Sequence, residues 1–393
     1  NSKPEKDIDI NQLDSDLAAA QKLEQGKNTI IGRIAMAFAF AMSLFHILTV
    51  FRQLDVIPQR GVHVAFAFTI LFLSMPLYEH VFKDKYAGNP TFRLVCRVVD
   101  ILLVLATWAS VYMCSYEYDH LSDNLGRAGI WAAVAGGILL VLTLEAARRC
   151  LGYIMPALGL IFIVYALVGE YLPGQLGHKG YSFSEIFKYL AVDLDGIFGT
   201  TISVSASTIF MFVMFGAFLE ASGCSTFIND LALSVTGKLR CGPALAAVVA
   251  SALMGCINGS AVANVVGTGT FTIPLMKSRG YKPDFAAGVE AVASTGGQIL
   301  PPVMGAGAFL MVAFTGEPYT AVVVAAAIPA VLYFLGAAFA VFAQGEVGNV
   351  ELLPPEQIPR TRDVLKDGWI YLVIIGALVY ALLVAQYSPA LSG

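Results

Sequence analysis

Two short stretches of this chain carry oxygen-bearing side chains where the backbone cannot continue a regular helix. The first is Asn258-Gly259-Ser260, and the second is Gly296–Pro302, which includes Gln298. Two consecutive prolines lack N–H groups, and glycines let the backbone open and let other groups approach closely. The carbonyls freed in this way, together with the side-chain oxygens, are hard ligands of the kind that suits Na⁺. These residue types therefore predict a site for a cation.

An anion at the same place would have to be held without a basic side chain. No Lys or Arg lies between Arg240 and Lys277 or between Lys282 and Arg360. Helix N-termini that face a break carry positive partial charge and suit a carboxylate. Broken helices with such ends are typical of ion-coupled secondary transporters. The candidate Na⁺ ligands are Asn258, Gly259, Ser260, Gly296, Gly297 and Gln298, and the candidate substrate contacts are Asn258, Ser260, Gln298, Pro301 and Pro302.

Glu290 is the third candidate, about two turns into the segment that the second break interrupts. A carboxylate at membrane depth is functional by default. It could pair with a neighbour, line the aqueous side of the site, or act directly on an ion or a proton. Hydroxyls such as those of Thr268 and Ser294 either join the site or bond to their own helix. The chain has no catalytic-triad or metalloprotease spacing, so we expect no enzyme, and nothing indicates nucleic-acid binding.

The elements that position these residues are membrane helices. The chain is 57% hydrophobic and 13% charged, whereas soluble proteins carry about 25% charged residues. Several apolar windows exceed the length needed to cross a bilayer, which predicts an all-α polytopic membrane protein. The expected spans are Thr29–Phe51, Val62–Phe82, Val98–Tyr116, Ile130–Ala147, Ile154–Leu172, Thr201–Leu219, Phe285–Phe314, Thr320–Phe342 and Trp369–Tyr387.

The segment Ala244–Met276 is too long for one span and too short for two. It is interrupted at Ile257–Ala261, and we expect further interruptions at Gly267 and Gly269. Basic residues flank both of its ends, so the positive-inside rule places both ends in the cytoplasm. The segment is therefore expected to enter the membrane, turn and leave on the same side as a re-entrant hairpin. With a cytoplasmic N-terminus, this topology leaves most of the 24 Lys and Arg residues inside.

Two smaller features complete the analysis from residues. Ser182 and Glu185 fit a capping box, so Phe183–Leu190 is expected to form a short helix in the external loop. This helix either docks a partner protein or rests on membrane lipids. The six cysteines form no CxxC pair, which indicates isolated thiols. His46 is expected to be a helix-contact residue.

The run "ASALMGCINGSAVANVVGTGTFTIPLMKSRGYKPDFAAGVEAVASTGGQILPPVMGAGAF" resembles the large membrane subunit of tripartite ATP-independent periplasmic (TRAP) transporters, in particular the TAXI subfamily with a fused small subunit. The resemblance implies an elevator-type Na⁺-coupled symporter of organic acids in the bacterial inner membrane, supplied by a periplasmic substrate-binding protein. It also implies two inverted repeats, of which this chain carries the first. The remaining half, on the same or a second chain, would bring a second hairpin, and without it the chain should be unstable or inactive.

The resemblance further implies a domain division: a cytoplasmic N-terminal arm (1–28), a four-helix scaffold module (29–149), the first permease half (150–343) with hairpin 244–276 and broken helix 285–314, a cytoplasmic linker (344–367), and the start of a second repeat (368–393). Two alternatives stay open. The same hairpin could line a channel or passive pore, marked by conductance without saturation. The chain could also belong to a stand-alone Na⁺/carboxylate symporter that needs no binding protein.

Overall fold

The described part of the chain is helical. The structure, a computed structural model, describes residues 29–78, 90–121, 123, 126–347 and 350–393, and these form helices, turns and coil without a strand. Eight helices in these ranges are long and apolar enough to cross a membrane. The chain is therefore a multi-pass α-helical protein, as expected. The arm expected over 1–28 and the end of the second expected span lie outside the described residues.

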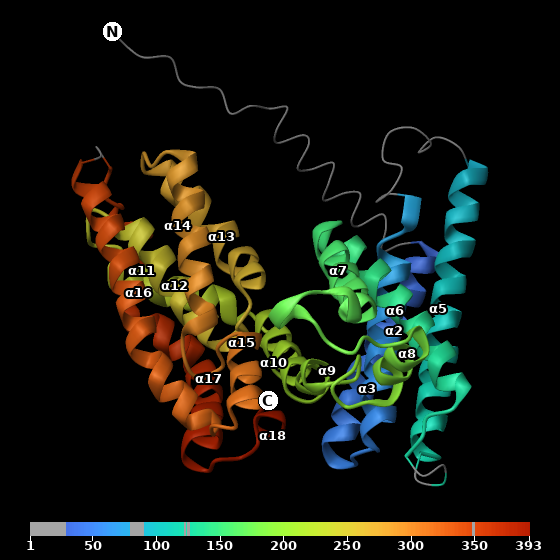
Figure 1. The fold of residues 1–393 in the computed structure, drawn as a ribbon. Coiled ribbons are helices and arrows are strands. Elements are labelled where there is room, and N and C mark those ends of the chain that lie inside the picture. The colour runs from blue at the N-terminus through green and yellow to red at the C-terminus, as the bar shows by residue number, and fades with distance from the viewer. Residues whose placement is uncertain (1–28, 79–89, 122, 124–125, 348–349) are drawn as a thin grey trace. The chain divides into compact units, whose positions relative to one another are not determined.

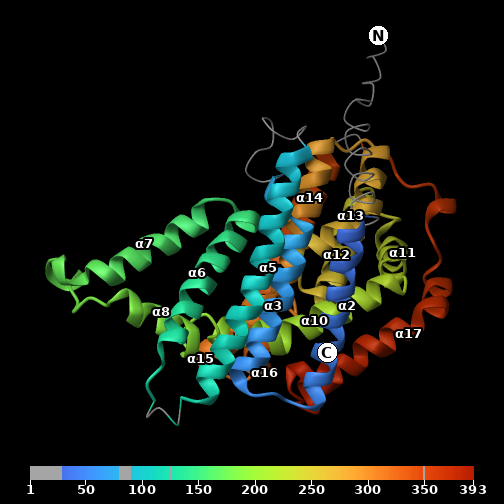
Figure 2. The same cartoon turned by 90° about the vertical axis from the view of Figure 1, so that its right-hand side faces the viewer.

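The chain divides into two compact units, Asn1–Ile202 and Ser203–Gly393. In the first unit, four long helices run side by side (Figures 1 and 2): α2 (Ile30–Phe51), α3 (Val56–Ser74), α5 (Pro90–Asp119) and α6 (Ile130–Leu151). The second of these begins earlier than expected because Pro58 falls in its first turn, where a missing N–H costs nothing. His46 Nε2 lies 2.8 Å from His63 Nδ1, so His46 does join two helices.

Two further helices of the first unit are α7 (Ile154–Val168) and α8 (Phe183–Val192). The expected capping box starts α8. The hydroxyl of Ser182 accepts a hydrogen bond from the amide of Glu185, and the carboxylate of Glu185 accepts one from the amide of Ser182. This helix packs against α6 so closely that a Cβ at Gly136 would lie 1.9 Å from the carbonyl oxygen of Phe187. Because α8 packs against α6, the first compact unit extends beyond residue 149. The expected division of the chain into functional domains stays a prediction.

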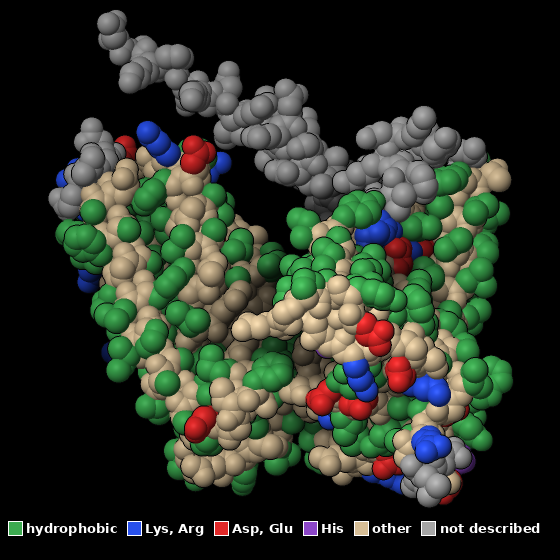
Figure 3. All heavy atoms as spheres, in the orientation of Figure 1, with side chains coloured by type: hydrophobic (Ala, Val, Ile, Leu, Met, Phe, Trp, Pro, Cys, Tyr) green, Lys and Arg blue, Asp and Glu red, His purple; other side chains and the backbone are tan. Residues whose placement is uncertain are grey.

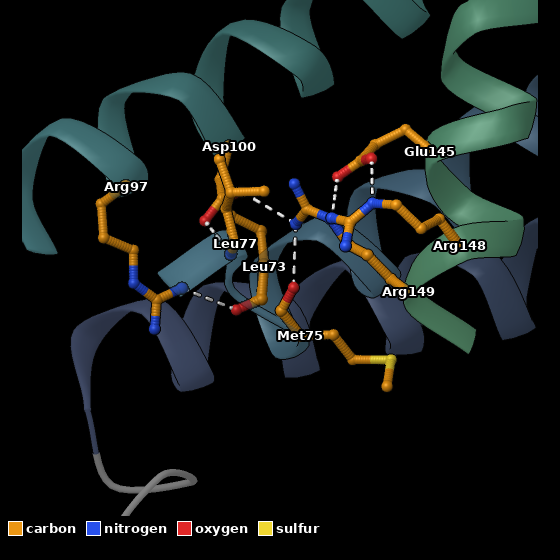
Figure 4. A network of polar contacts seen from close by, with 8 residues as sticks. All are labelled: Leu73, Met75, Leu77, Arg97, Asp100, Glu145, Arg148 and Arg149. Carbon is orange, nitrogen blue, oxygen red and sulfur yellow. Dashed lines mark hydrogen bonds and ion pairs between the residues drawn. The ribbon is translucent and has the colours of Figure 1, made fainter. Parts of the chain in front are cut away.

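A buried ionic network joins three helices of the first unit (Figure 4). Arg149 on α6 lies 2.8 Å from Asp100 on α5 and 2.7 Å from Glu145. It also donates to the carbonyl of Met75, just past the end of α3 (2.8 Å). A buried charge is stable only when it is paired and hydrogen-bonded, and Arg149 therefore fixes the relative positions of α3, α5 and α6.

The second unit contains the two breaks. The expected sixth span is α9 (Thr200–Val204), a π-helical turn η3 (Ser205–Ile209) and α10 (Phe210–Ala221). It is followed by α11 (Cys224–Thr236), α12 (Gly242–Asn258), α13 (Ala261–Ser278), α14 (Pro283–Gly296), the 3₁₀ turn η4 (Gly297–Ile299) and α15 (Ala306–Thr315). The unit ends with α16 (Tyr319–Val347), η5 (Pro355–Gln357), α17 (Thr361–Val379), the π-turn η6 (Tyr380–Val384) and α18 (Pro389–Ser392).

The apolar surface of the second unit fits a membrane setting. In the space-filling view, the visible sides of α14 and α16 are largely hydrophobic, and charged side chains gather at the end where α13 meets α14 (Figure 3). The segment expected as a linker over 344–367 contains the end of one helix and the start of the next. Helix α16 continues to Val347 and α17 already begins at Thr361.

Candidate functional site

The expected turn at Asn258-Gly259-Ser260 is the tip of a helical hairpin. Helix α12 ends at Asn258, and its C-cap residue Gly259 has a left-handed backbone (φ 59°) that favours glycine. Ser260 then caps α13, and its Oγ accepts a hydrogen bond from the amide of Ala263 (3.3 Å). The amide of Ser260 donates to Asn258 Oδ1 (3.2 Å). The two arms of the hairpin pack against each other.

The further interruptions expected at Gly267 and Gly269 are wrong, because α13 runs through both residues. Gly269 instead makes room for a neighbouring helix. A Cβ there would lie 2.9 Å from Cγ of Glu290. Small residues are enriched where membrane helices pack closely, and the sequence pattern alone does not distinguish a packing glycine from a breaking one.

The expected break at Gly296–Pro302 separates α14 from α15 and extends to Gly305. The amide of Gly305 donates to the carbonyl of Gln298 (2.6 Å). The hydroxyl of Tyr319 on α16 lies 2.6 Å from the carbonyl oxygen of Pro302 and 2.7 Å from that of Val303. A single buried hydroxyl is thus within hydrogen-bond distance of two carbonyl oxygens of the break. A role for Tyr319 was not expected from the sequence, in which it stands just before the expected span Thr320–Phe342.

The hairpin tip contacts the break through backbone atoms. A Cβ at Gly259 would lie 1.8 Å from the carbonyl oxygen of Met304, and one at Gly255 would lie 2.3 Å from Cα of Gly297. The amide of Val303 also donates to the carbonyl of Cys256 (3.3 Å). Because glycine has no side chain, the two non-helical segments can approach to this distance. The chain therefore brings together two breaks that are about 40 residues apart in sequence.

A cavity of about 260 Å³ opens where the tip meets the break. Four of the predicted site residues line it, namely Asn258, Gly259, Ser260 and Gln298, and its other walls are apolar or small. None of the described residues that line it is charged. Its volume is below the roughly 300–1,000 Å³ of sites for drug-sized ligands, so it suits an ion with a small organic molecule.

The N-terminal ends of two helices, which carry positive partial charge, lie at this cavity. Ser260 is the N-cap of α13, while Ala306 and Gly307, which also line the cavity, begin α15. Asn258 Nδ2 is buried and has no hydrogen-bond partner among the described residues. Unpaired donors and helix N-termini favour an anion such as a carboxylate. The cavity thus offers oxygen ligands for a cation and N–H donors for an anion.

The remaining predicted residues lie beside the cavity. Gly296 packs on the ring of Tyr333, where a Cβ would come 2.5 Å from a ring carbon, and Gly297 packs on the hairpin arm. Pro301 and Pro302 shape the break but do not line the cavity. Glu290 is also outside it, fully buried among hydroxyls of α12, α13 and α14.

Comparisons with known proteins identify similar sequences. Residues 138–393 match the family model described as tripartite ATP-independent periplasmic transporter, DctM component. A C4-dicarboxylate TRAP transporter large permease protein, DctM of Pseudomonas aeruginosa, is 27% identical over 189 residues, which cover 46% of this chain and 43% of that protein. The isethionate TRAP transporter permease protein DctMQ of Oleidesulfovibrio alaskensis is 30% identical over 190 residues, 46% of this chain and 30% of that protein.

A shorter match is to the 2,3-diketo-L-gulonate TRAP transporter large permease protein YiaN of Escherichia coli, which is 33% identical over 100 residues, 25% of this chain and 24% of that protein. The chain thus spans less than half the length of each of these curated relatives. The matched family is one of transporters rather than enzymes.

Proposed function

Because the chain belongs to the family of the DctM component of tripartite ATP-independent periplasmic transporters, we propose that it is the membrane component of a Na⁺-coupled secondary transporter. In this proposal it imports an organic acid across the bacterial inner membrane with the help of a periplasmic binding protein. The observation that carries the proposal is the uncharged cavity in which the hairpin tip meets the break.

The proposed Na⁺ site uses the oxygens of the two breaks. Asn258, Ser260 and Gln298 contribute side-chain oxygens, and Gly259, Gly296 and Gly297 contribute carbonyls. Hard oxygen donors fit Na⁺, and non-helical backbone at membrane depth is tolerated only where it is buried or lines a polar cavity. Na⁺ would supply the positive charge that the lining residues lack.

The proposed substrate site shares the cavity. A carboxylate would be held by the free Nδ2 of Asn258, by Ser260 and Gln298, and by the first amides of α13 and α15. Pro301 and Pro302 would act indirectly, by keeping the break open. The carboxylic and sulfonic acids in the names of the relatives are anions of small size, which is compatible with this cavity.

The proposed assembly has further parts. The helices α2, α3 and α5 precede the residues that match the DctM family, and we propose that they form a fused small subunit of the TAXI type. A second inverted repeat would face the hairpin tip and complete an elevator-type permease. The relatives extend well beyond the matched segments, which supports additional permease sequence outside these 393 residues. A periplasmic binding protein would dock on external loops that include α8.

The test is uptake of an organic acid into proteoliposomes that contain the complete permease and its binding protein. An inward Na⁺ gradient should drive accumulation, and replacing Na⁺ by K⁺ should abolish it. Equal uptake with K⁺ would refute Na⁺ coupling. Conductance without saturation and without the binding protein would instead identify a channel, and saturable uptake without the binding protein would identify a stand-alone symporter.

A further inference from the structure

Four buried hydroxyl groups converge on the carboxyl group of Glu290. Its Oε1 accepts hydrogen bonds from Ser251 Oγ (3.0 Å), Thr268 Oγ1 (2.5 Å) and Ser294 Oγ (3.1 Å). Its Oε2 accepts one from Thr272 Oγ1 (2.5 Å). These five residues, called the hydroxyl cluster below, are each at most 1% exposed. The hydroxyls belong to α12, α13 and α14, so one carboxyl group joins both arms of the hairpin to the first half of the broken helix.

The hydroxyl cluster lies about two helical turns from the cavity on each of these helices. Each helix carries one residue of the cluster and, seven or eight positions away, one residue that lines the cavity. The pairs are Ser251 and Asn258 on α12, Thr268 and Ser260 on α13 with its cap, and Glu290 and Gln298 on α14 with η4. This separation corresponds to roughly 10–13 Å along a helix. The carboxyl group thus fixes the relative height of the three helix ends that form the cavity.

A second buried contact lies between the hydroxyl cluster and the cavity. Asn264 on α13, four residues from both Ser260 and Thr268, is fully buried and donates from Nδ2 to the carbonyl of Ser251 (2.8 Å). The same nitrogen lies 3.1 Å from the position that a Cβ at Gly297 would take. Interiors packed this closely transmit a displacement from one layer to the next. A shift at the cluster is therefore expected to reach the break.

The hydroxyl cluster acts on the cavity from a distance. None of its five residues lines the cavity, so Glu290 does not supply a wall of the site. A hydroxyl group can both donate and accept, and the same contacts therefore form with a carboxylate or with a carboxylic acid. The contacts require a side chain at position 290 that is long enough to reach all four hydroxyls, whatever its charge.

We propose that Glu290 is a positioning residue for the cavity. By holding α12, α13 and α14 at one height, it places the oxygens of Asn258, Ser260 and Gln298 relative to one another. Groups that bind a ligand must be held to within about 0.5 Å by the contacts that support them. A side chain shorter by one methylene group would withdraw the carboxyl group by up to about 1.5 Å. The inference deepens the proposed function and rests on it for the effect on transport, whereas the effect on the geometry does not depend on it.

Two conservative substitutions separate the reach of the side chain from its charge. Glu290→Gln keeps the length and loses the charge, whereas Glu290→Asp keeps the charge and loses one methylene group. In the glutamine variant the NH₂ group can donate to Thr272 Oγ1, because the proton of that hydroxyl has a second acceptor in the carbonyl of Thr268 (3.1 Å). We therefore expect the glutamine variant to behave like the wild type and the aspartate variant to differ from it.

Hydrogen exchange at Val303 measures the geometry without transport. The amide of Val303, in the break, donates to the carbonyl of Cys256 near the hairpin tip (3.3 Å). In the complete permease, this amide should exchange roughly two- to thirtyfold faster in Glu290→Asp than in the wild type, the range by which changes within a packed network alter coupling. It should exchange at the wild-type rate in Glu290→Gln. Amides of α17, which packs against α11, should keep their rates, since only a general loss of stability would accelerate them.

The Na⁺ requirement relates this geometry to transport. In the complete, reconstituted transporter with its binding protein, Glu290→Asp should raise the Na⁺ concentration for half-maximal uptake roughly two- to thirtyfold. Glu290→Gln should leave it unchanged. A matched pair on α13 provides the control. Thr272→Val removes a hydroxyl of the cluster and should raise the requirement, whereas Thr270→Val changes an exposed residue and should not.

The outcomes separate three explanations. A defect in Glu290→Gln with wild-type behaviour of Glu290→Asp would assign the role to charge and overturn the proposal. Equal effects of the two substitutions, or an effect of neither, would also overturn it, as would faster exchange at Val303 with an unchanged Na⁺ requirement. Wild-type uptake that is equal in K⁺ would refute Na⁺ coupling instead. The exchange measurement would still decide whether Glu290 holds the tip against the break.

Discussion

Substitution of Gly259 by alanine tests the contact between the hairpin tip and the break. The backbone of Gly259 is left-handed, and a Cβ there would lie 1.8 Å from the carbonyl oxygen of Met304. A left-handed conformation costs a residue with a side chain about 1–2 kcal/mol, and forcing an atom into filled space adds about 1–3 kcal/mol. The neighbouring atom belongs to the backbone, so no side-chain rotation relieves the clash. We therefore expect Gly259→Ala to destabilise the protein by about 2–5 kcal/mol.

Gly316→Ala is the matched control because it separates the cost of a left-handed backbone from the cost of the steric clash. Gly316 is also left-handed (φ 72°), but a Cβ there would meet nothing within 4 Å. It should cost only the conformational term of about 1–2 kcal/mol. Both variants would be unfolded with denaturant in detergent micelles, and organic-acid uptake would be measured below their melting temperatures. Equal destabilisation by the two substitutions would refute the close approach of Gly259 to the break.

Three other predictions concern groups around the site and its scaffold. Arg149→Met should destabilise the first unit by about 3–5 kcal/mol because it leaves a buried carboxylate uncompensated, as measured by denaturant unfolding. Tyr319→Phe should cost about 1–3 kcal/mol by leaving two buried carbonyls of the break without a donor, and thermal melting checks this. Hydrogen bonds from the backbone and hydroxyl of Ser182 lower the pKa of Glu185. The stability that they give α8 is therefore present at neutral pH and lost as the pH falls through the folded pKa, which hydrogen exchange in α8 would detect.

Each of these predictions has a control. Arg148→Met removes a partly exposed ion pair and should change the unfolding free energy by at most about 1 kcal/mol. An equal loss in both arginine variants would contradict the buried network. Tyr333→Phe removes an exposed hydroxyl bond and should have a small effect beside that of Tyr319→Phe. In Ser182→Ala, hydrogen exchange in α8 should depend less on pH, and an unchanged acid dependence would remove Glu185 from the cap.

The sequence predicts the breaks better than it predicts what surrounds them. Asn258-Gly259-Ser260 and Gly296–Pro302 are recognisable because consecutive glycine, proline and capping residues cannot continue a helix, whatever the tertiary context. Gly267 and Gly269 were misjudged because a lone glycine is tolerated within a helix when a neighbour packs against it. Helix α11 was not expected, since its apolar residues are mixed with polar ones and do not form a long hydrophobic window.

The cluster around Glu290 depends on contacts that no local pattern specifies. Spacings of four residues, as in Thr268/Thr272 and Glu290/Ser294, place oxygens on one helix face and were the available signal. Whether such hydroxyls bond to their own helix or to another depends on helix packing, and here Thr268 and Thr272 do both. The hydrogen bonds of Tyr319 to the break likewise arise only from the tertiary fold.

The most direct test of the proposed site is the Na⁺ concentration that gives half-maximal uptake in the complete, reconstituted transporter with its binding protein. Ser260→Gly removes the hydroxyl ligand but leaves a residue that caps a helix almost as well, and Gln298→Ala removes the amide oxygen. Loss of one ligand worth about 1.4 kcal/mol should raise the required Na⁺ concentration roughly tenfold. The exposed controls Ser278→Ala and Gln344→Ala should leave it unchanged. An unaltered Na⁺ requirement in both site variants would contradict a Na⁺ site at the hairpin tip and the break.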